Sequence, residues 1–87
     1  MFLHLGQSTV ITYDEIIGIF DLENTSISKR TRDFLARQET DGKIINVSSE
    51  LPRSFILAGR DEADGRVYIS QLSSATLLKR FEQERIG

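Results

Sequence analysis

The sequence predicts a small α+β domain in which a curved, mainly antiparallel β-sheet is flanked by two α-helices. Two runs rich in β-branched and aromatic residues, Ser54–Ala58 and Arg66–Ser70, enclose a turn that carries glycine and aspartate, which is typical of a β-hairpin. Two other stretches place apolar residues at helical spacing. Because the chain has 87 residues, we expect one domain, residues 1–87.

The predicted hairpin, Pro52 to Ser70, is the stretch that the rest of the chain covers or extends. Pro52 cannot donate a hydrogen bond to a sheet and marks the entry to the first strand. The acidic turn 59–65 lacks the spacing of a calcium loop, because its alternate positions are Asp61, Ala63 and Gly65. We interpret it as a solvated turn.

The N-terminal part of the chain predicts two short strands. Phe2–Leu5 alternates between two faces, Gly6–Ser8 forms a turn, and Val10–Ile11 begins the second strand. His4 is the single histidine and has no cysteine, serine motif or carboxylate pair beside it in the sequence. We interpret it as a structural or surface residue.

The stretch from Ile16 to Leu22 is apolar on both faces. Strict alternation places Ile17 and Ile19 on one face, and Ile16, Phe20 and Leu22 on the other. Strands buried on both sides have this composition. A chain of this length has few layers to cover two faces, so we expect a second subunit to cover one. The sequence therefore predicts a homo-oligomer whose interface contains Ile16, Ile17, Ile19, Phe20 and Leu22; association through open sheet edges is the alternative.

A polar connection, residues 23–26, precedes a predicted helix that is capped by Ser26 or Ser28 and reaches about Glu39. Asp41–Gly42 supplies its stop, since glycine is common just past a helix. Its apolar face is expected to contain Ile27, Thr31, Phe34, Leu35 and Gln38.

A short strand, Ile44–Val47, and a polar loop, Ser48–Leu51, lead to the hairpin. After the hairpin, Ser73 can cap a closing helix that extends to about Glu84. The inward stripe of this helix is expected to consist of Leu77, Leu78 and Phe81.

The composition excludes several classes of function. Without cysteine the chain has no disulfide, thiolate nucleophile or cysteine metal site, and one histidine cannot build a multi-histidine metal cage. Neither a nucleophile elbow nor a glycine-rich phosphate loop is present. We therefore expect a protein that is not an enzyme and has no catalytic residue, metal or cofactor. The start of the chain lacks a signal peptide and no run is long enough to span a membrane, which predicts a cytoplasmic protein without a membrane partner.

The formal net charge of −2 argues against bulk attraction to nucleic acid, yet the middle helix begins with three cations, Lys29, Arg30 and Arg32. The helix dipole disfavours cations there by ~0.3–1 kcal/mol each. Phosphates would suit this helix start, since its amides also favour anions. The alternative is a solvated face on which Asp33 pairs with cations four residues away. Arg53, at the mouth of the first hairpin strand, is a weaker candidate for phosphate contact.

Several short stretches occur in one order from the first residues to about Arg80. They are Phe2–Gly6, Val10–Ile11, Glu15–Leu22, Pro52–Leu57, Val67–Ser70 and Ser73–Ser74 with Thr76–Leu77. In these stretches the chain resembles the extracellular matrix regulatory proteins of Gram-positive bacteria, the RemA/RemB group, and specifically its RemB side. The resemblance implies a LytTR-like fold and a non-enzymatic, cytoplasmic regulator of extracellular matrix (biofilm) gene expression. It also implies a homo-oligomer, for which the RemA side suggests a ring.

The resemblance further implies DNA binding, at positions where this chain differs from the family pattern. RemA-like chains carry an arginine just before the Ile-Ile strand and an arginine pair in the loop before the hairpin. Here those positions hold Glu15 and Glu50–Leu51. An acid reverses the sign of a phosphate contact. If DNA is bound, we therefore expect the contacts from Lys29, Arg30, Arg32 and Arg53. The alternative function is an oligomeric protein-interaction scaffold without direct DNA contact.

Overall fold

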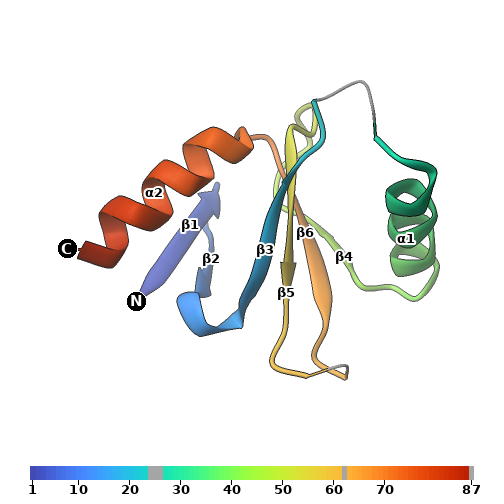
Figure 1. Ribbon diagram of the computed structural model, residues 1–87, viewed down its shortest axis with the longest axis horizontal. Helices are drawn as coiled ribbons and strands as arrows, with labels where there is room; N and C mark the ends of the chain where they lie inside the picture. The colour runs from blue at the N-terminus through green and yellow to red at the C-terminus, as the bar shows by residue number, and fades with distance from the viewer. Residues whose placement is uncertain (24–26, 62, 87) are drawn as a thin grey trace.

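The computed structural model describes residues 1–23, 27–61 and 63–86, with the side chains of residues 85 and 86 outside that description. Its elements confirm the predicted α+β class (Figure 1). In chain order they are β1 (Phe2–Gly6), β2 (Thr9–Thr12), the 3-10 helix η1 (Tyr13–Glu15), β3 (Ile16–Asp21), α1 (Lys29–Thr40), β4 (Ile44–Asn46), β5 (Ser54–Ala58), β6 (Arg66–Ser70) and α2 (Ser74–Ile86).

The strands form two sheets. The larger has the order β3-β5-β6-β4, so the predicted hairpin β5–β6 supplies its two central strands. Strand β4 pairs parallel to β6, and the other pairs among the described strands are antiparallel. Strands β1 and β2 form a separate two-stranded ribbon. Together with α2, this ribbon lies on one side of the larger sheet, and α1 lies on the other side (Figure 1).

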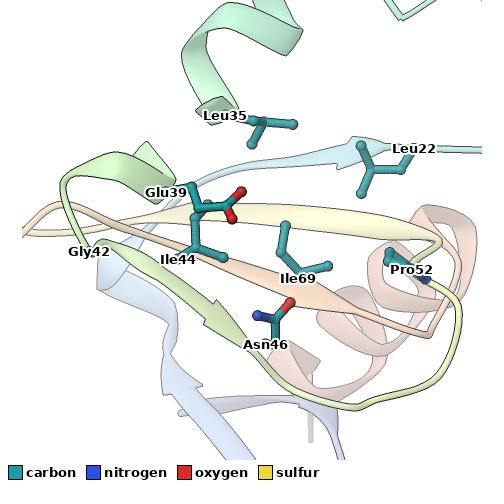
Figure 2. A pocket seen from close by; sticks show the side chains of 8 residues that line it. All are labelled: Leu22, Leu35, Glu39, Gly42, Ile44, Asn46, Pro52 and Ile69. Atoms are coloured by element: carbon teal, nitrogen blue, oxygen red, sulfur yellow. The ribbon is translucent and has the colours of Figure 1, made fainter. Parts of the chain in front are cut away.

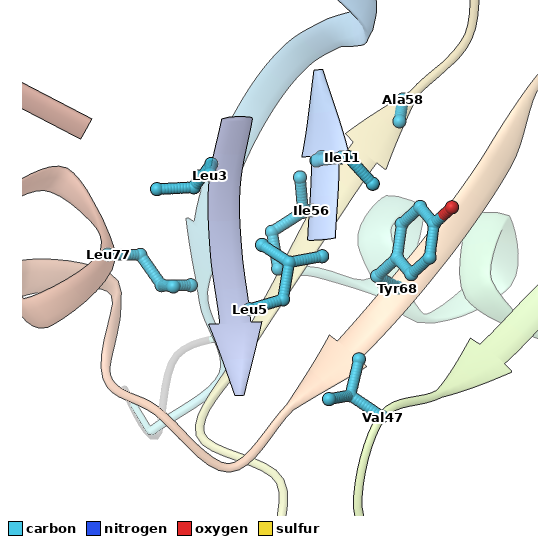
Figure 3. Close-up of a cluster of buried hydrophobic side chains, with 8 residues drawn as sticks. All are labelled: Leu3, Leu5, Ile11, Val47, Ile56, Ala58, Tyr68 and Leu77. Atoms are coloured by element: carbon cyan, nitrogen blue, oxygen red, sulfur yellow. The ribbon is translucent and has the colours of Figure 1, made fainter. Parts of the chain in front are cut away.

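The hydrophobic core lies between the larger sheet and the β1–β2 ribbon with α2 (Figure 3). Alternation along β1 turns Leu3 and Leu5 inward, where they are fully buried, and leaves Phe2 exposed. Ile56 of β5 and Leu77 of α2 complete the centre of this core and are also fully buried. The burial of these aliphatic side chains stabilises the fold by roughly 1.5–3 kcal/mol each.

Helix α1 covers the opposite face of the sheet without burying any residue fully. The Oγ atom of Ser28 accepts a hydrogen bond from the Thr31 N–H at 3.2 Å, which confirms one of the two predicted caps. The other, Ser26, lies outside the described residues. The inward side of α1 is half-buried and is formed by the predicted residues Thr31, Phe34, Leu35 and Gln38.

Strand β3 is an edge strand with a β-bulge at Ile17. Ile16 lies opposite Ala58 and Gly18 lies opposite Leu57, so Ile17 has no partner of its own on β5. The bulge interrupts the strict alternation assumed from the sequence. A β-bulge of this kind leaves no clear signal in a run of alternating apolar residues.

The bulge also corrects the predicted division of β3 into two faces. Ile16 and Ile19 both pack against the core, whereas Ile16 was expected on the face of Phe20. Phe20 stacks on Phe55 with ring centroids 4.8 Å apart, and both rings line a pocket with residues of α1. Leu22 follows the strand and also contributes to the α1 side.

Helix α2 begins as predicted, because the Ser73 Oγ accepts a hydrogen bond from the Thr76 N–H at 3.1 Å. Leu77 is fully buried, but Leu78 is 48% exposed, so its assignment to the inward stripe was wrong. Adjacent residues of a helix with 3.6 residues per turn point about 100° apart. Leu78 therefore lies at the rim of the core, where it shares a groove with Ile17.

Candidate nucleic-acid interface

The first turn of α1 presents three cations to solvent. Lys29, Arg30 and Arg32 are exposed, and the turn contains no acidic residue. None of the three forms an ion pair with a residue that the structure describes. Asp33, expected as their surface partner, is likewise without an ion pair in the described chain. The unfavourable interaction of these cations with the helix dipole is therefore not relieved by a neighbouring carboxylate.

The backbone at the start of α1 is fixed by Ser28. Its Oγ atom accepts a hydrogen bond from the Thr31 N–H, and its carbonyl oxygen accepts one from the Arg32 N–H at 3.1 Å. The N–H groups of Lys29 and Arg30 meet no acceptor among the described residues, as is usual in a first helical turn. Free amides and cations therefore occur together at this end of the helix, an arrangement that suits a phosphate group.

Arg53 lies just before β5 and is already paired. Its Nε atom is 3.0 Å from a carboxylate oxygen of Glu23, and the two side chains are 48% and 44% exposed. The Arg53 carbonyl accepts a hydrogen bond from the Leu22 N–H at 3.0 Å, which holds the end of β3 beside the start of β5. A phosphate that contacts Arg53 would have to compete with the carboxylate of Glu23.

The predicted contact residues occupy two elements. Lys29, Arg30 and Arg32 lie together on α1, whereas no described contact joins Arg53 to them. Helix α1 and strand β5 both begin at the upper end of the view in Figure 1, with α1 set apart to the right of the sheet. Phosphates that bridge the two elements would therefore approach the molecule at this end.

Glu15, at a position where the resemblance implies an arginine, forms hydrogen bonds within this chain. Its carboxylate accepts hydrogen bonds from the Thr12 hydroxyl at 2.7 Å and from the Arg66 guanidinium at 3.1 Å. The Thr12 hydroxyl and then Arg66 lower the pKa of Glu15 to about 2. The carboxylate ties η1 to the hairpin, so the substitution has a structural role as well as a reversed charge.

The sequence reasoning missed Arg66 as the partner of Glu15. The Arg66 Nε donates to the Tyr68 hydroxyl at 2.9 Å, and its Nη1 contacts a carboxylate oxygen of Asp64 at 3.2 Å. The hydrogen bond to Tyr68, followed by the one to Glu15, raises the pKa of Arg66. The Thr12-x-x-Glu15 spacing, which matches a capping box, was the one local signal that could have indicated a fixed carboxylate.

The loop before β5 presents an apolar side chain to solvent. Its backbone is turned by a hydrogen bond from the Glu50 N–H to the Ser48 hydroxyl at 3.0 Å. Leu51 is 82% exposed, the highest value among the large hydrophobic residues of the described chain. This loop therefore offers an acid and an aliphatic group where the family resemblance leads one to expect two arginines.

A pocket of about 420 Å³ separates α1 from the sheet (Figure 2). In Figure 2 the carboxylate of Glu39 lies near Ile44, and the carboxamide of Asn46, which belongs to β4, lies beside Ile69. The lining residues are Leu22, Leu35, Glu39, Gly42, Ile44, Asn46, Pro52 and Ile69. Helix α1 has no fully buried residue, whereas α2 inserts the fully buried Leu77, so α1 contacts the sheet less closely than α2 contacts the core.

Within the described residues, no three histidine or acidic side chains lie close enough together to hold a metal ion. The lone histidine, His4, is on the surface, with its Nδ1 3.3 Å from a carboxylate oxygen of Glu84. The acidic turn forms bonds within itself, since Asp61 accepts from the Asp64 N–H at 2.9 Å; residue 62 of that turn lies outside the description. None of the described helices is both long enough and apolar enough to cross a membrane.

Two comparisons place this chain among known proteins. Residues 2–81 match the family model described as RemA-like, extracellular matrix regulatory protein A-like. The chain is also 32% identical over 80 residues to extracellular matrix regulatory protein B of Bacillus subtilis (strain 168). That alignment covers 92% of this chain and 89% of the Bacillus protein.

Proposed function

Because the chain belongs to the RemA-like family of extracellular matrix regulatory proteins, we propose that it is a non-enzymatic regulator of extracellular matrix (biofilm) gene expression. In this proposal it acts in the cytoplasm as a homo-oligomer and binds duplex DNA. The contacts come from the first turn of α1, with Arg53 as an additional contact.

The cations at the start of α1 are the observation that supports DNA binding. Lys29, Arg30 and Arg32 are solvent-exposed and have no carboxylate partner in the described chain. Their positive charges interact unfavourably with the helix dipole, so without an anion nearby they lower the stability of the fold. A phosphate beside them would interact favourably with the cations, the free amides and the dipole at once. Residues that break a local rule in this manner often serve a function.

One such turn per subunit makes a weak site, and the formal net charge of −2 adds no general attraction to DNA. A closed oligomer repeats the turn once in each subunit. When several turns contact one duplex, the later contacts form at a high effective concentration, which raises the overall affinity. Oligomer formation is therefore part of the proposed mechanism.

A second candidate function is a protein-interaction scaffold without DNA contact. It is supported by Glu15 and Glu50, which replace expected cations, and by Leu51, whose side chain is 82% exposed. An exposed leucine in a loop is better suited to an apolar protein surface than to phosphate.

The two candidates are distinguished by the salt dependence of duplex binding. We expect the wild-type protein to bind a fluorescent 30-base-pair duplex in anisotropy titrations, with an affinity that falls as salt rises. Changing Lys29, Arg30 and Arg32 to alanine should lower the affinity and reduce the slope of log K against log salt by about 0.9 for each lost phosphate contact.

A matched control removes the same number of charges elsewhere. It changes Lys43, Lys79 and Arg80 to alanine and should alter the slope much less, because these cations lie outside the first turn of α1. Equal losses in both variants would indicate a general charge effect and contradict the proposed site. The absence of binding at low salt would favour the scaffold.

A further inference from the structure

The two outer strands of the larger sheet, β3 and β4, differ in length. Strand β4 has three residues and is therefore a short edge, and a helix contacts each outer strand, α1 on β4 and α2 on β3. Strand β3 has six residues, and no described strand pairs with its outer edge. Open edges of this length expose unpaired N–H and C=O groups, which natural proteins usually shield with lysine, proline or short strands. Strand β3 contains neither lysine nor proline.

Two apolar pockets flank β3 on opposite faces of the sheet. A groove of about 250 Å³ on the α2 side is lined in part by Ile17, Ile19 and Leu78. A pocket of about 280 Å³ on the α1 side has a mostly apolar lining that includes Phe20 and Phe34, and Arg30, one of the proposed DNA contacts, also borders it. Successive side chains of a strand point to opposite faces. A strand added to this edge would therefore place its side chains alternately towards the two pockets, as in known strand-addition complexes.

The segment that occupies this edge must be apolar on both of its faces, and β3 itself meets that requirement. Ile17 is 63% exposed and borders the α2-side groove, whereas Phe20 is 43% exposed and borders the α1-side pocket. Two copies of β3 related by a two-fold axis would supply both the side chains and the pockets. Such an isologous contact is complementary to itself.

The charges at the ends of β3 favour an antiparallel pair. At one end Asp21 is exposed and accepts a hydrogen bond from the Glu23 N–H, but it forms no ion pair in the described chain. At the other end the side chain of Arg60 is 65% exposed and lies 3.8 Å from Glu15, whose carboxylate is held more closely by Thr12 and Arg66. An antiparallel pair brings Asp21 of one copy towards Arg60 of the other, whereas a parallel pair brings the two Asp21 residues together.

We propose that β3 pairs antiparallel with β3 of a second copy of this chain, with Ile17 and Phe20 of each copy against the apolar pockets of the other and Asp21 facing Arg60 across the interface. The inference rests on the proposed homo-oligomer and specifies one of its interfaces. The four-stranded sheets of the two copies become one continuous sheet.

A lysine at the exposed edge tests this interface. In multi-angle light scattering at micromolar concentration, the Ile17→Lys variant should have at most about half the wild-type mass, since a desolvated charge on an apolar interface opposes association. The Val10→Lys variant should keep the wild-type mass, because Val10 is 44% exposed and belongs to the β1–β2 ribbon and not to the sheet that contains β3. Circular dichroism checks that both variants fold. A folded Ile17→Lys protein of wild-type mass would overturn the inference.

A charge exchange tests the antiparallel orientation. Asp21→Lys and Arg60→Glu should each weaken association about tenfold or more, because each places like charges across the interface. The double variant restores opposite charges and should recover most of the wild-type affinity. If it fails to recover, the two residues do not face each other and the geometry is wrong.

These outcomes separate the interface from the proposed function. A wild-type protein that is monomeric contradicts both. An oligomer that is insensitive to Ile17→Lys contradicts only the β3 interface and indicates another surface, such as the β4 edge. In anisotropy titrations the folded Ile17→Lys variant, whose α1 cations are unchanged, should keep the weak salt-dependent contact of a single turn and lose the gain that comes from repeated turns; loss of all binding would contradict the α1 contact itself.

Discussion

Glu15 and Arg53 are charged residues whose local partners determine what each can contribute at the surface. The carboxylate of Glu15 is held by Thr12 and Arg66, and the guanidinium of Arg53 is held by Glu23. Charges that are already paired interact less strongly with an external phosphate than unpaired ones. The three cations of the first α1 turn lack such partners in the described chain, which distinguishes them from Arg53.

The Glu15 interactions predict a pH dependence of stability. Because the fold lowers the pKa of Glu15 from 4.5 to about 2, the charged carboxylate stabilises the folded state above pH 4.5. This contribution is lost as the pH falls from 4.5 towards 2. Glu15→Gln should therefore lower the free energy of unfolding at pH 7, and its difference from the wild type should shrink as the pH falls through this window.

Urea unfolding at pH 7, 4.5 and 2.5 measures this difference. Glu82→Gln is the control, because Glu82 is exposed on α2 and has no ion pair in the described chain. If Glu15→Gln lowers the free energy of unfolding by the same amount at all three pH values, the loss of stability arises from the changed shape of the side chain and not from its charge.

The ion pair of Arg53 predicts a gain of DNA binding when its partner is neutralised. Glu23→Gln removes the carboxylate that lies 3.0 Å from the Arg53 Nε and lowers the negative charge near the start of β5. Affinity for duplex DNA should rise, and the slope of log K against log salt should steepen by about 0.9 if Arg53 gains one phosphate. An effect no larger than that of Glu82→Gln would argue against Arg53 as a contact.

The two helices are attached to the sheet in different ways. Helix α2 inserts the fully buried Leu77 into the core, whereas α1 has no fully buried residue and is separated from the sheet by a pocket of about 420 Å³. Local opening requires less free energy where few apolar contacts are lost. Helix α1, which carries the candidate DNA contacts, is therefore expected to open more readily than α2.

Matched changes of the two N-caps test this difference. Ser28→Ala and Ser73→Ala each remove a side-chain hydrogen bond to a helix amide, which costs about 0.5–2 kcal/mol. In hydrogen exchange, Ser28→Ala should reduce the protection of α1 amides and leave β5 and β6 unchanged. Ser73→Ala should reduce protection throughout the core. Equal, global losses in both variants would mean that α1 is as firmly attached as α2.

The elements themselves were largely predictable from local patterns. The bounds of β5 and β6, the Ser28 cap and the half-buried face of α1 agree with expectation, because each depends on neighbouring residues. The bulge at Ile17 and the exposure of Leu78 were not predictable in this way. Both depend on packing between segments that are far apart in the chain, which periodicity alone does not encode.

The candidate site was predictable only in part for the same reason. The sequence indicated the cations of α1, which are consecutive or nearly so. It did not indicate the ion pair between Glu23 and Arg53 or the one between Glu15 and Arg66. The residues of the first pair are 30 positions apart in the sequence, and those of the second are 51 positions apart. Such long-range ion pairs determine which charged side chains can contact a phosphate, and they are identified only from the folded structure.

The two faces of the larger sheet differ in how well they are covered. One face holds the core beneath the β1–β2 ribbon and α2, and on the other face pockets lie between α1 and the sheet. Apolar side chains remain exposed at the β3 edge between them, including Ile17 and Phe20. A second copy that covers this edge would both complete the sheet and repeat the cations of α1.

The mass of the protein in solution tests the proposed assembly most directly. Multi-angle light scattering of the wild-type chain, from low to high micromolar concentration, should give a multiple of the 9.9 kDa subunit mass. A folded protein with the mass of one subunit at every concentration would contradict the proposed assembly and, with it, the repeated DNA contact.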